Sequence, residues 1–318
     1  MSSNEQIAGN RERPQIIALF GPTGVGKTAI AVALGELLRA KGEDPVAVSA
    51  DALQVYIGLE TLTGVASPAE RAALEHRMIS FLPLDATFSV GEYARLAHAE
   101  IDGLLASGRR PIVVGGTGLY LRAALADLDL RPAPREGARE RWTTQLQELG
   151  PQALHAELAR HAPQAAEGID PSNARRTIRA LEALEAGELP HAETGEQPEE
   201  PSQLWSEELR HPTLLAGLTM EREALYAQID ARVEQIVAAG ATEEVRRAYA
   251  VGISETARKA LGFEQLLTGD IETMKRRTRN YARRQLSWMR KLAGVRTIDV
   301  TDREPAAVAE EILDSAGA

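Results

Sequence analysis

Short apolar runs alternate with longer stretches of helical periodicity through the first 126 residues. The runs at 16–20, 45–50 and 110–117 are mostly apolar and predict buried β-strands. Helical periodicity follows over 28–40, 68–77, 89–106 and from 118 onward, and residues 58–68 form a loop rich in Gly, Thr and Ser. Strands that alternate with helices favour a parallel sheet covered by helices. We therefore predict an α/β fold, with the first part of its core in 1–126.

The pattern changes after residue 126. Only helical periodicity is found over 136–190, with breaks near Gly150, Pro163 and Asp170. We predict an all-helical insertion over 127–204, with an exposed linker rich in Pro and Glu at about 187–206. Strand character returns at 211–219 and 295–300, and helices are predicted between them over 221–239, 242–250, 255–267 and 271–292. The second part of the core therefore covers 205–318.

A glycine-rich turn joins the first predicted strand to the first helix. It reads Gly21-Pro-Thr-Gly-Val-Gly-Lys27-Thr28, and this spacing between a strand and a helix is typical of a phosphate-binding loop. Glycines let backbone N–H groups surround an anion, Lys27 adds a positive charge, and the Thr28 hydroxyl can bind Mg²⁺. The predicted phosphate site consists of Gly21, Pro22, Thr23, Gly24, Val25, Gly26, Lys27 and Thr28, with Thr28 as metal ligand. The loop does not by itself tell which phosphate compound is bound.

Two charged residues lie at the ends of predicted elements. Asp51 comes directly after the strand at 45–50, and ligands of open α/β sheets bind at the carboxyl ends of strands. An Asp at this position can also cap a following helix, so both interpretations are open. Arg222 lies at the start of the helix predicted over 221–239, where its charge opposes the helix dipole. This unfavourable position indicates that Arg222 binds an anion.

Composition restricts the class of protein. The chain of 318 residues has 44% hydrophobic and 26% charged residues, no cysteine and a formal net charge of −10. The lack of cysteine excludes disulfides and thiolate zinc sites. No apolar run approaches the roughly 20 residues that span a bilayer, and residues 1–14 lack the apolar segment of a signal peptide. We expect a cytoplasmic protein that does not associate with membranes.

A basic segment stands out in this acidic protein. Lys275–Lys291 contains eight Lys or Arg residues and no acid, whereas 193–208 and 302–318 are acidic. In the predicted insertion, Arg175, Arg176 and Arg179 share one helix face through their spacing. A solvated surface is the ordinary explanation of such a face, and contact with nucleic-acid phosphates is the functional one.

Several motifs in a fixed order point to one family. Besides the phosphate loop they are Ser49-Ala-Asp-Ala-Leu-Gln-Val-Tyr56, Gly115-Gly-Thr-Gly-Leu-Tyr120, Asn173-Ala-Arg-Arg-Thr-Ile-Arg-Ala-Leu-Glu182, Thr256-Ala-Arg-Lys-Ala-Leu-Gly-Phe263 and Tyr281-Ala-Arg-Arg-Gln-Leu-Ser-Trp-Met-Arg-Lys291. Together they resemble the bacterial tRNA dimethylallyltransferase family over about residues 14–300. The resemblance implies a P-loop NTPase-like core. It also implies transfer of a dimethylallyl group from its diphosphate to N6 of adenine 37, next to the tRNA anticodon.

The resemblance further implies roles for single residues. The phosphate loop would hold dimethylallyl diphosphate with Mg²⁺, Thr23 would bond its bridging oxygen, Arg222 would clamp it, and Asp51 would be the general base. The implied contacts with the anticodon stem-loop of tRNA are Asp51, Ala52, Leu53, Gln54, Thr117, Arg139, Arg175, Arg176, Arg179, Lys259, Gly262, Phe263, Arg283, Arg284, Gln285, Trp288 and Arg290. For Trp288, a place in the core is the alternative to stacking on a base. We expect a monomer.

Two other functions are open at this stage. A small-molecule P-loop kinase would use the same loop, although it has no need of the basic segment Lys275–Lys291. A catalytically impaired tRNA-binding paralogue is the second alternative, because residues near Asp51 depart from the family pattern. Ala52 and Leu53 stand where the family usually has Ser and Arg.

Overall fold

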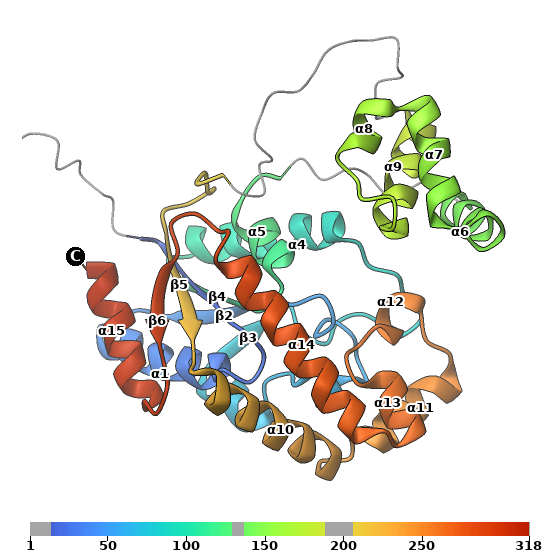
Figure 1. Ribbon diagram of the computed structural model, residues 1–318. Helices are drawn as coiled ribbons and strands as arrows, with labels where there is room; N and C mark the ends of the chain where they lie inside the picture. Colours follow the sequence, from blue (N-terminus) through green and yellow to red (C-terminus); the bar gives the residue numbers. More distant parts are fainter. Residues whose placement is uncertain (1–13, 129–136, 188–205, 318) are drawn as a thin grey trace, which may run out of the picture. The chain divides into compact units, whose positions relative to one another are not determined.

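The computed structural model describes residues 14–128, 137–187 and 206–317 (Figure 1). Internal contacts divide the chain into two compact units, one formed by Met1–Leu128 with Ser202–Ala318 and the other by Asp129–Pro201. In the larger unit helices pack against a β-sheet, and the described part of the smaller unit is helical. Within the described ranges, no helix has the length and apolar character needed to span a membrane.

Parallel strands form the sheet of the larger unit in the order β3-β2-β4-β1-β5-β6. They are β1 (Ile16–Phe20), β2 (Pro45–Ala50), β3 (Glu75–Arg77), β4 (Arg110–Gly115), β5 (Thr213–Thr219) and β6 (Arg296–Asp299). The central strand β1 lies between β4 and β5, with Ile17 opposite both Ile112 and Leu214. Every residue of β1 and β2 is buried, which explains why these strands are continuous apolar runs. The predicted α/β fold with a parallel core sheet is confirmed.

Most helices of the larger unit lie close to their predicted positions. They are α1 (Lys27–Ala40), α4 (Val90–Ala106), α5 (Gly118–Leu125), α10 (Arg222–Ala238), α11 (Ala241–Val251) and α14 (Ile271–Met289). Ser89 caps α4 through a capping box with Glu92. One apolar cluster joins Leu34 of α1, Ile17 of β1 and Ile229 of α10. This core holds the turns that follow the strands in fixed positions.

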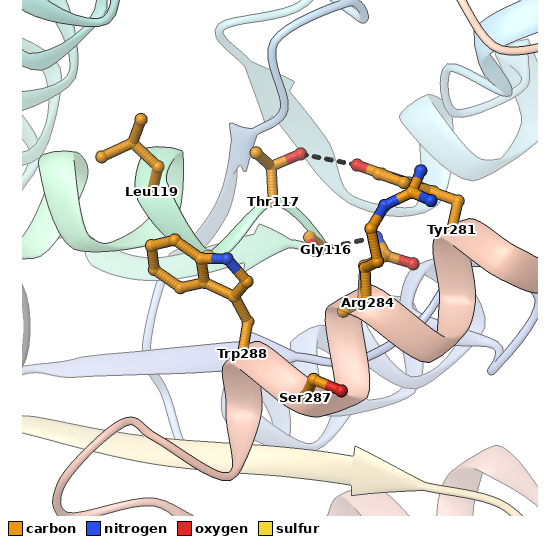
Figure 2. A pocket seen from close by; sticks show the side chains of 9 residues that line it. Gly116, Thr117, Leu119, Tyr281, Arg284, Ser287 and Trp288 are labelled. Carbon is orange, nitrogen blue, oxygen red and sulfur yellow. Dashed lines mark hydrogen bonds between the residues drawn. The ribbon is translucent and has the colours of Figure 1, made fainter. Parts of the chain in front are cut away.

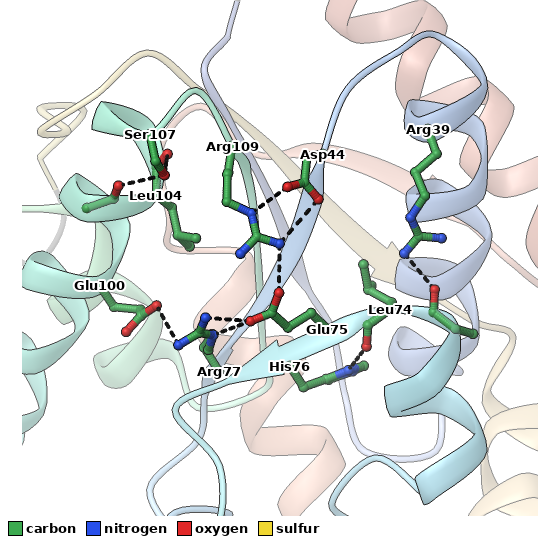
Figure 3. Close-up of polar contacts among 12 residues, drawn as sticks. Arg39, Asp44, Leu74, Glu75, His76, Arg77, Glu100, Leu104, Ser107 and Arg109 are labelled. Carbon is green, nitrogen blue, oxygen red and sulfur yellow. Dashed lines mark hydrogen bonds and ion pairs between the residues drawn. The ribbon is translucent and has the colours of Figure 1, made fainter.

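Residues 68–77, predicted as one helix, form two elements. The helix α3 (Pro68–Ala73) ends early, and Glu75–Arg77 forms the edge strand β3. The prediction was wrong because β3 has no apolar run and is anchored by charge instead. Arg109 binds Glu75 of β3 at 2.7 Å and Asp44, next to β2, at 2.7 Å (Figure 3). The hydrogen bond from Arg109 also holds the pKa of Glu75 below its usual range, so the pair stays ionised at neutral pH.

Other elements of the larger unit also differ from prediction. A short helix, α2 (Glu60–Thr63), lies within the predicted loop at 58–68. The helix predicted over 255–267 is broken into α12 (Glu255–Arg258) and α13 (Phe263–Thr268), because Gly262 is left-handed with φ of 98°. The acidic segment 302–318 contains the unpredicted helix α15 (Pro305–Gly317), which packs against α1 with Val308 and Ile312 in the core. Its excess of acidic residues hid an apolar face with helical spacing.

The smaller unit has its own core. Its helices are α6 (Ala138–Leu149), α7 (Pro151–His161), α8 (Pro163–Glu167) and α9 (Ala174–Ala186). Leu154, Leu158 and Leu181 are fully buried among them. Arg139 of α6 donates to the buried Glu182 of α9 from Nε and Nη2, at 2.7 and 2.9 Å. Prolines begin α7 and α8, where the breaks were predicted. Most of the predicted linker at 187–206 lies outside the described residues.

Candidate active site at the carboxyl ends of the strands

The glycine-rich loop turns from β1 into α1. Gly26 is the N-cap of α1 with φ of 88°, a left-handed conformation that glycine adopts without strain. Lys27 folds back over the loop, and its Nζ donates to the carbonyl oxygens of Gly21 at 2.9 Å and Pro22 at 2.8 Å. Burial, with a contribution from the positive charge of Arg232, lowers the pKa of Lys27 to about 7. A bound anion would reverse this shift, because it favours the charged form of the lysine.

Thr28 is the second residue of α1 and the predicted metal ligand. Among the residues that the structure describes, none forms a hydrogen bond with its hydroxyl, which is therefore available to a ligand. No cluster of acidic or histidine side chains in the same ranges could hold a metal ion. Mg²⁺ at this site would be held by Thr28, diphosphate oxygens and water, which fits its preference for few protein ligands.

A second cation, which the sequence did not predict as a site residue, acts on Lys27. Arg232 of α10 acts electrostatically on Lys27, and Asp51 and Glu70 act on Arg232. Its guanidinium lies against Gly64, where a β-carbon would overlap it and where φ is 63°. Within the described ranges, no hydrogen bond or ion pair engages this guanidinium. Arg232 therefore offers donors to an anion at the same place as Lys27.

The sequence places Arg232 beside an apolar helix face, but it does not show what that face crosses. The buried face of α10 is formed by Leu225, Ile229 and Val233. Arg232 follows Ile229 by three residues and so lies on the edge of that face. A cation next to an apolar helix face that crosses the phosphate loop is a candidate ligand-binding group. Ile229 confirms the crossing, since a β-carbon on Gly24 would touch its side chain.

Asp51 follows β2 and faces the same region. Its Oδ1 accepts hydrogen bonds from the backbone N–H groups of Leu53 at 2.9 Å and Gln54 at 3.3 Å. The interpretation of Asp51 as a helix cap is wrong, since a turn follows it instead of a helix. No hydrogen bond from the described residues reaches Oδ2.

Burial raises the pKa of Tyr93 and that of Tyr281, the latter to about 12, and the charge of Asp51 adds to both shifts.

Gln54 holds the loop that faces Arg232. Its Oε1 accepts from the Ser49 hydroxyl at 2.8 Å, and its Nε2 donates to the Gly64 carbonyl oxygen at 3.1 Å. The amide of Gln54, at a position predicted to contact RNA, is thus engaged inside the protein. Its neighbours Ala52 and Leu53, also predicted contacts, are half-buried.

Glu244 supports the same loop from the other side. This buried residue of α11 accepts hydrogen bonds from the backbone N–H groups of Thr61 at 2.9 Å and Leu62 at 2.8 Å. The carboxylate therefore caps the start of α2, whose C-cap is Gly64. Glu244 fixes the segment against which Arg232 lies.

Gln285 connects the basic helix α14 to the phosphate loop. Its Oε1 accepts the backbone N–H of Thr23 at 2.8 Å, and its Nε2 donates to the Gly116 carbonyl oxygen at 2.8 Å. One turn earlier, the Tyr281 hydroxyl lies 3.0 Å from the Thr117 hydroxyl. Gln285 was predicted as an RNA contact, but it is buried and both ends of its amide bind the protein. These bonds join α14 to the turns after β1 and β4.

A largely apolar cavity of about 300 Å³ lies beside these bonds (Figure 2). It is lined by Gly116, Thr117, Gly118, Leu119, Tyr281, Arg284, Gln285, Ser287 and Trp288. The half-buried Trp288 indole packs on Gly118, where a β-carbon would overlap the ring. The Arg284 guanidinium carbon lies 5.5 Å from the centre of the Tyr281 ring, a cation–π contact. Aromatic and cationic walls of this kind bind nucleobases.

The predicted RNA contacts of the smaller unit lie on its helix α9 and on α6. Arg175 and Arg176 are exposed on α9, whereas Arg179 binds Glu182 at 3.3 Å. Arg139 binds the same carboxylate, and about half of its side chain is exposed. The arginine face predicted at 175–179 therefore exists, with one member engaged in an ion pair.

The predicted contacts between α12 and α13 differ in exposure. Lys259 is exposed at the end of α12, while Gly262 is buried. Phe263 is fully buried and offers no surface to an RNA. Of these three residues, only Lys259 can reach a ligand with its side chain.

Arg222 lines a cavity that contains no residue of the phosphate loop. It begins α10 and lines this second cavity together with Arg283 and Arg290 of α14. Arg232 comes ten residues later on the same helix, a separation of ~15 Å along the axis. Arg232, and not Arg222, is the arginine whose charge acts on Lys27.

A parallel sheet with a phosphate loop after β1 and a carboxylate after β2 defines a P-loop NTPase-like α/β protein. A family model described as IPP transferase matches residues 54–292 of the chain. The chain belongs to this family.

Relatives resemble the chain over nearly its whole length. The tRNA dimethylallyltransferase of Geobacillus thermodenitrificans is 39% identical over 313 residues, which cover 94% of this chain and 95% of that protein. The tRNA dimethylallyltransferase of Kineococcus radiotolerans is 39% identical over 312 residues, with the same coverage of 94% and 95%.

Solved structures show the same fold. The full-length tRNA isopentenylpyrophosphate transferase of Bacillus halodurans is 32% identical and has a TM-score of 0.65, with 96% of this chain and 95% of that chain covered. A eukaryotic dimethylallyltransferase acting on tRNA is 24% identical with a TM-score of 0.68, covering 90% of this chain and 74% of its own. The latter likeness concerns the fold.

Proposed function

We propose that the protein transfers a dimethylallyl group from dimethylallyl diphosphate to N6 of adenine 37 in tRNA and releases diphosphate. One observation carries the proposal: the phosphate loop after β1 and the Asp51 carboxylate after β2 lie at the same carboxyl edge of the parallel sheet, where the charge of Asp51 acts on Lys27. A diphosphate ester and a proton-bearing nucleophile are the two reactants that such a site serves. The names of the relatives and of the solved structures support prenyl transfer to tRNA.

The phosphate loop binds the leaving group. Negative charge grows on the diphosphate as the bond between its oxygen and the allylic C1 breaks, and Lys27 and Arg232 stabilise that charge. The Thr23 hydroxyl is assigned to the bridging oxygen, while its N–H is held by Gln285. When bound, Mg²⁺ on Thr28 supplies additional positive charge to the leaving group.

Asp51 accepts the proton of the nucleophile. Adenine N6 is a weak nucleophile because its lone pair is delocalised into the ring. The N6–C1 bond forms as the C1–O bond breaks, and an N6 proton passes to Oδ2 of Asp51, since Oδ1 accepts the N–H groups of Leu53 and Gln54. General-base assistance of this kind contributes about 10²–10⁴-fold to the rate.

The RNA approaches from the side of α14. Adenine 37 has to leave its stack to reach Asp51, which costs a few kcal/mol and less in a loop than in a duplex. The cavity bounded by Trp288, Tyr281 and Arg284 provides surface for bases near the reacting one. The exposed arginines of α14 supply contacts to phosphates.

Labelled donors test the proposed reaction. Unmodified tRNA is incubated with labelled dimethylallyl diphosphate or with labelled ATP, and the tRNA nucleosides are then analysed. We expect dimethylallyl adenosine at position 37 from the first donor only. Transfer of label from ATP alone would instead identify a kinase, and tRNA binding without product would identify an impaired paralogue.

Asp51→Ala tests the base. We expect a rate lower by about 10²-fold or more, with little change in tRNA affinity. Asp85→Ala, at an exposed acidic position, is the matched control. An unchanged rate in Asp51→Ala would remove Asp51 as the general base.

A further inference from the structure

The start of α10 and the end of α14 enclose a cavity of about 330 Å³ that contains neither Asp51 nor any residue of the phosphate loop. It is lined by Met220, Arg222, Leu225, Tyr226, Arg283, Leu286, Ser287 and Arg290. Three of these eight side chains are guanidinium groups and none is acidic. In a chain with a net charge of −10, such a concentration of positive charge needs an explanation.

Ion pairs join α10 and α14 along one part of their contact and, within the described residues, are missing along the other. They pack against each other, and two ion pairs join them away from the cavity: Glu234 with Lys275 at 2.8 Å, and Asp230 with Arg279 at 2.7 Å. The acidic positions 234 and 230 are four residues apart, and the next position in this series is Tyr226. The helices are therefore antiparallel, and the ion pairs end where the cavity begins.

The next position after Tyr226 in the same series is Arg222, a cation where the pattern would place an acid. Its guanidinium carbon lies 5.4 Å from the centre of the Tyr226 ring. The neighbouring Glu221 directs its carboxylate to the backbone N–H groups of Glu223 and Ala224 and caps the helix. Arg222 thus has an aromatic neighbour and, in the described part of the chain, no carboxylate partner.

The two arginines on α14 are likewise held by neutral groups. Arg283 donates to the Asn280 side-chain oxygen at 2.6 Å, and Arg290 donates to the Ser287 hydroxyl at 3.1 Å. In the described ranges neither has an ion pair with an acid. Each guanidinium has five N–H donors, so most of them are available to an anion. Arginine also matches the geometry of phosphate oxygens better than lysine does.

We propose that Arg222, Arg283 and Arg290 bind a backbone phosphate of the RNA substrate, at a site separate from the donor diphosphate. This inference rests on the proposed function and changes the role of Arg222 that the family resemblance implies. No residue of the phosphate loop lines the cavity, and Arg222 is ~15 Å along α10 from Arg232, which neighbours Lys27.

The position of the cavity favours a strand of RNA over a small anion. Ser287 lines both this cavity and the aromatic one beside Trp288, so the two cavities are neighbours that share one residue of α14. A polynucleotide that crosses α14 at Ser287 can place a base on the Trp288 side and a phosphate on the arginine side. A free diphosphate cannot use both cavities in this way.

Salt-dependent binding of RNA tests the assignment. An unmodified anticodon stem-loop is titrated without donor between about 50 and 200 mM salt, and inorganic diphosphate is titrated separately. Arg222→Gln should weaken RNA binding about tenfold and reduce the slope of log K against log salt by about one. Affinity for diphosphate should stay within about twofold of that of the unmodified protein.

Two further variants complete the experiment. Arg290→Gln changes an exposed residue directly after α14. It should lower the slope of log K against log salt by about the same amount, so it replaces Arg222→Gln if that variant does not fold. Arg246→Gln, an exposed arginine of α11 paired with Glu243, is the matched control and should leave the slope unchanged.

The outcomes separate this inference from the proposed function. Weaker diphosphate binding with unchanged RNA binding would assign Arg222 to the donor and overturn the proposal, as would an unchanged salt slope. If the unmodified protein forms no prenylated tRNA while Arg222→Gln lowers the salt slope of RNA binding, the proposed reaction is wrong and the phosphate site is supported. If the protein forms product and the slope does not change, only the phosphate site fails.

Discussion

Gln285 of α14 accepts a hydrogen bond from the backbone N–H of Thr23, so the basic helix is bonded directly to the phosphate loop. The same amide donates to the carbonyl oxygen of Gly116, in the turn after β4. A side chain on this basic helix thereby controls the shape of the loop that binds the leaving group.

Replacement of Gln285 by methionine should loosen the phosphate loop. The N–H of the half-buried Thr23 and the buried carbonyl of Gly116 would each lose a partner, at a cost of up to about 1–3 kcal/mol per group. We expect a lower free energy of unfolding and a higher KM for dimethylallyl diphosphate. Denaturant unfolding and initial rates measure the two effects. Gln235→Met, on the exposed side of α10, is the control. A stable variant with unchanged KM would contradict a role for Gln285 in shaping the loop.

Removal of the Arg232 charge should weaken binding of the donor. Charge-assisted hydrogen bonds contribute about 1.5–3 kcal/mol, so Arg232→Met should raise the Kd for inorganic diphosphate about 10–100-fold. The pKa of Lys27 should rise in the same variant, because a neighbouring positive charge is lost. Isothermal titration calorimetry gives the Kd, and Arg246→Met on α11 is the control. Unchanged affinity would show that Arg232 does not face the diphosphate.

Binding of the donor should depend on pH through Lys27. Its pKa in the free protein is about 7, below the ordinary value, so the ammonium loses its proton as pH rises through 7. A bound diphosphate raises this pKa, and binding above pH 7 therefore takes up a proton. Affinity should fall between pH 7 and pH 9 by up to about tenfold per pH unit. The second ionisation of phosphate groups, near about pH 6, lies below this window.

Lys27→Arg provides the control for this pH dependence. The guanidinium stays charged throughout the range, so affinity for dimethylallyl diphosphate should become nearly independent of pH. Calorimetry in buffers of different ionisation enthalpy measures the proton uptake directly. A flat profile in the unmodified protein would mean that Lys27 is charged before the ligand binds.

Glu244 should act on catalysis through the loop it caps. Glu244→Gln leaves only one side-chain oxygen for the N–H groups of Thr61 and Leu62. We expect a loss of about 1–3 kcal/mol in the free energy of unfolding and a several-fold lower kcat. The adjacent Glu243 has an exposed side chain, so Glu243→Gln should change neither quantity. Equal effects of both substitutions would exclude a specific role for the cap.

Continuous apolar runs made much of the fold predictable. β1, β2, β4 and β5 are strands buried in a parallel sheet, and the loop at 21–28 could be placed because strand, glycines and helix follow one another. β3 could not be predicted, since Glu75-His-Arg77 carries no apolar pattern and depends on Arg109 and Asp44, which are distant in sequence. The helix α15 was hidden for a related reason, because its acidic residues dominate the composition of its segment.

The candidate site was less predictable than the fold. Asp51 was found because a carboxylate at a strand end is a local feature. Arg232 was missed because its importance depends on where α10 crosses the phosphate loop, which no local pattern gives. The position of Arg222 at a helix start indicated an anion, and the family resemblance implied the donor diphosphate; the structure places Arg222 in a cavity that no residue of the phosphate loop lines. Gln285 illustrates the same limit, since its two partners lie 262 and 169 residues away in the chain.

The strand order of the sheet has a consequence for biosynthesis. β1 is made first, yet it pairs with β5, which ends at Thr219, and its phosphate loop is bonded to Gln285. Helices α6 to α9 make mostly local contacts and so can fold while the sheet is still incomplete. We expect chains stalled near residue 230, where α9 has left the ribosome and β5 has not, to protect these helices from protease and to leave residues 21–28 open to it. The phosphate loop is thus among the first segments to leave the ribosome and among the last to take its final shape.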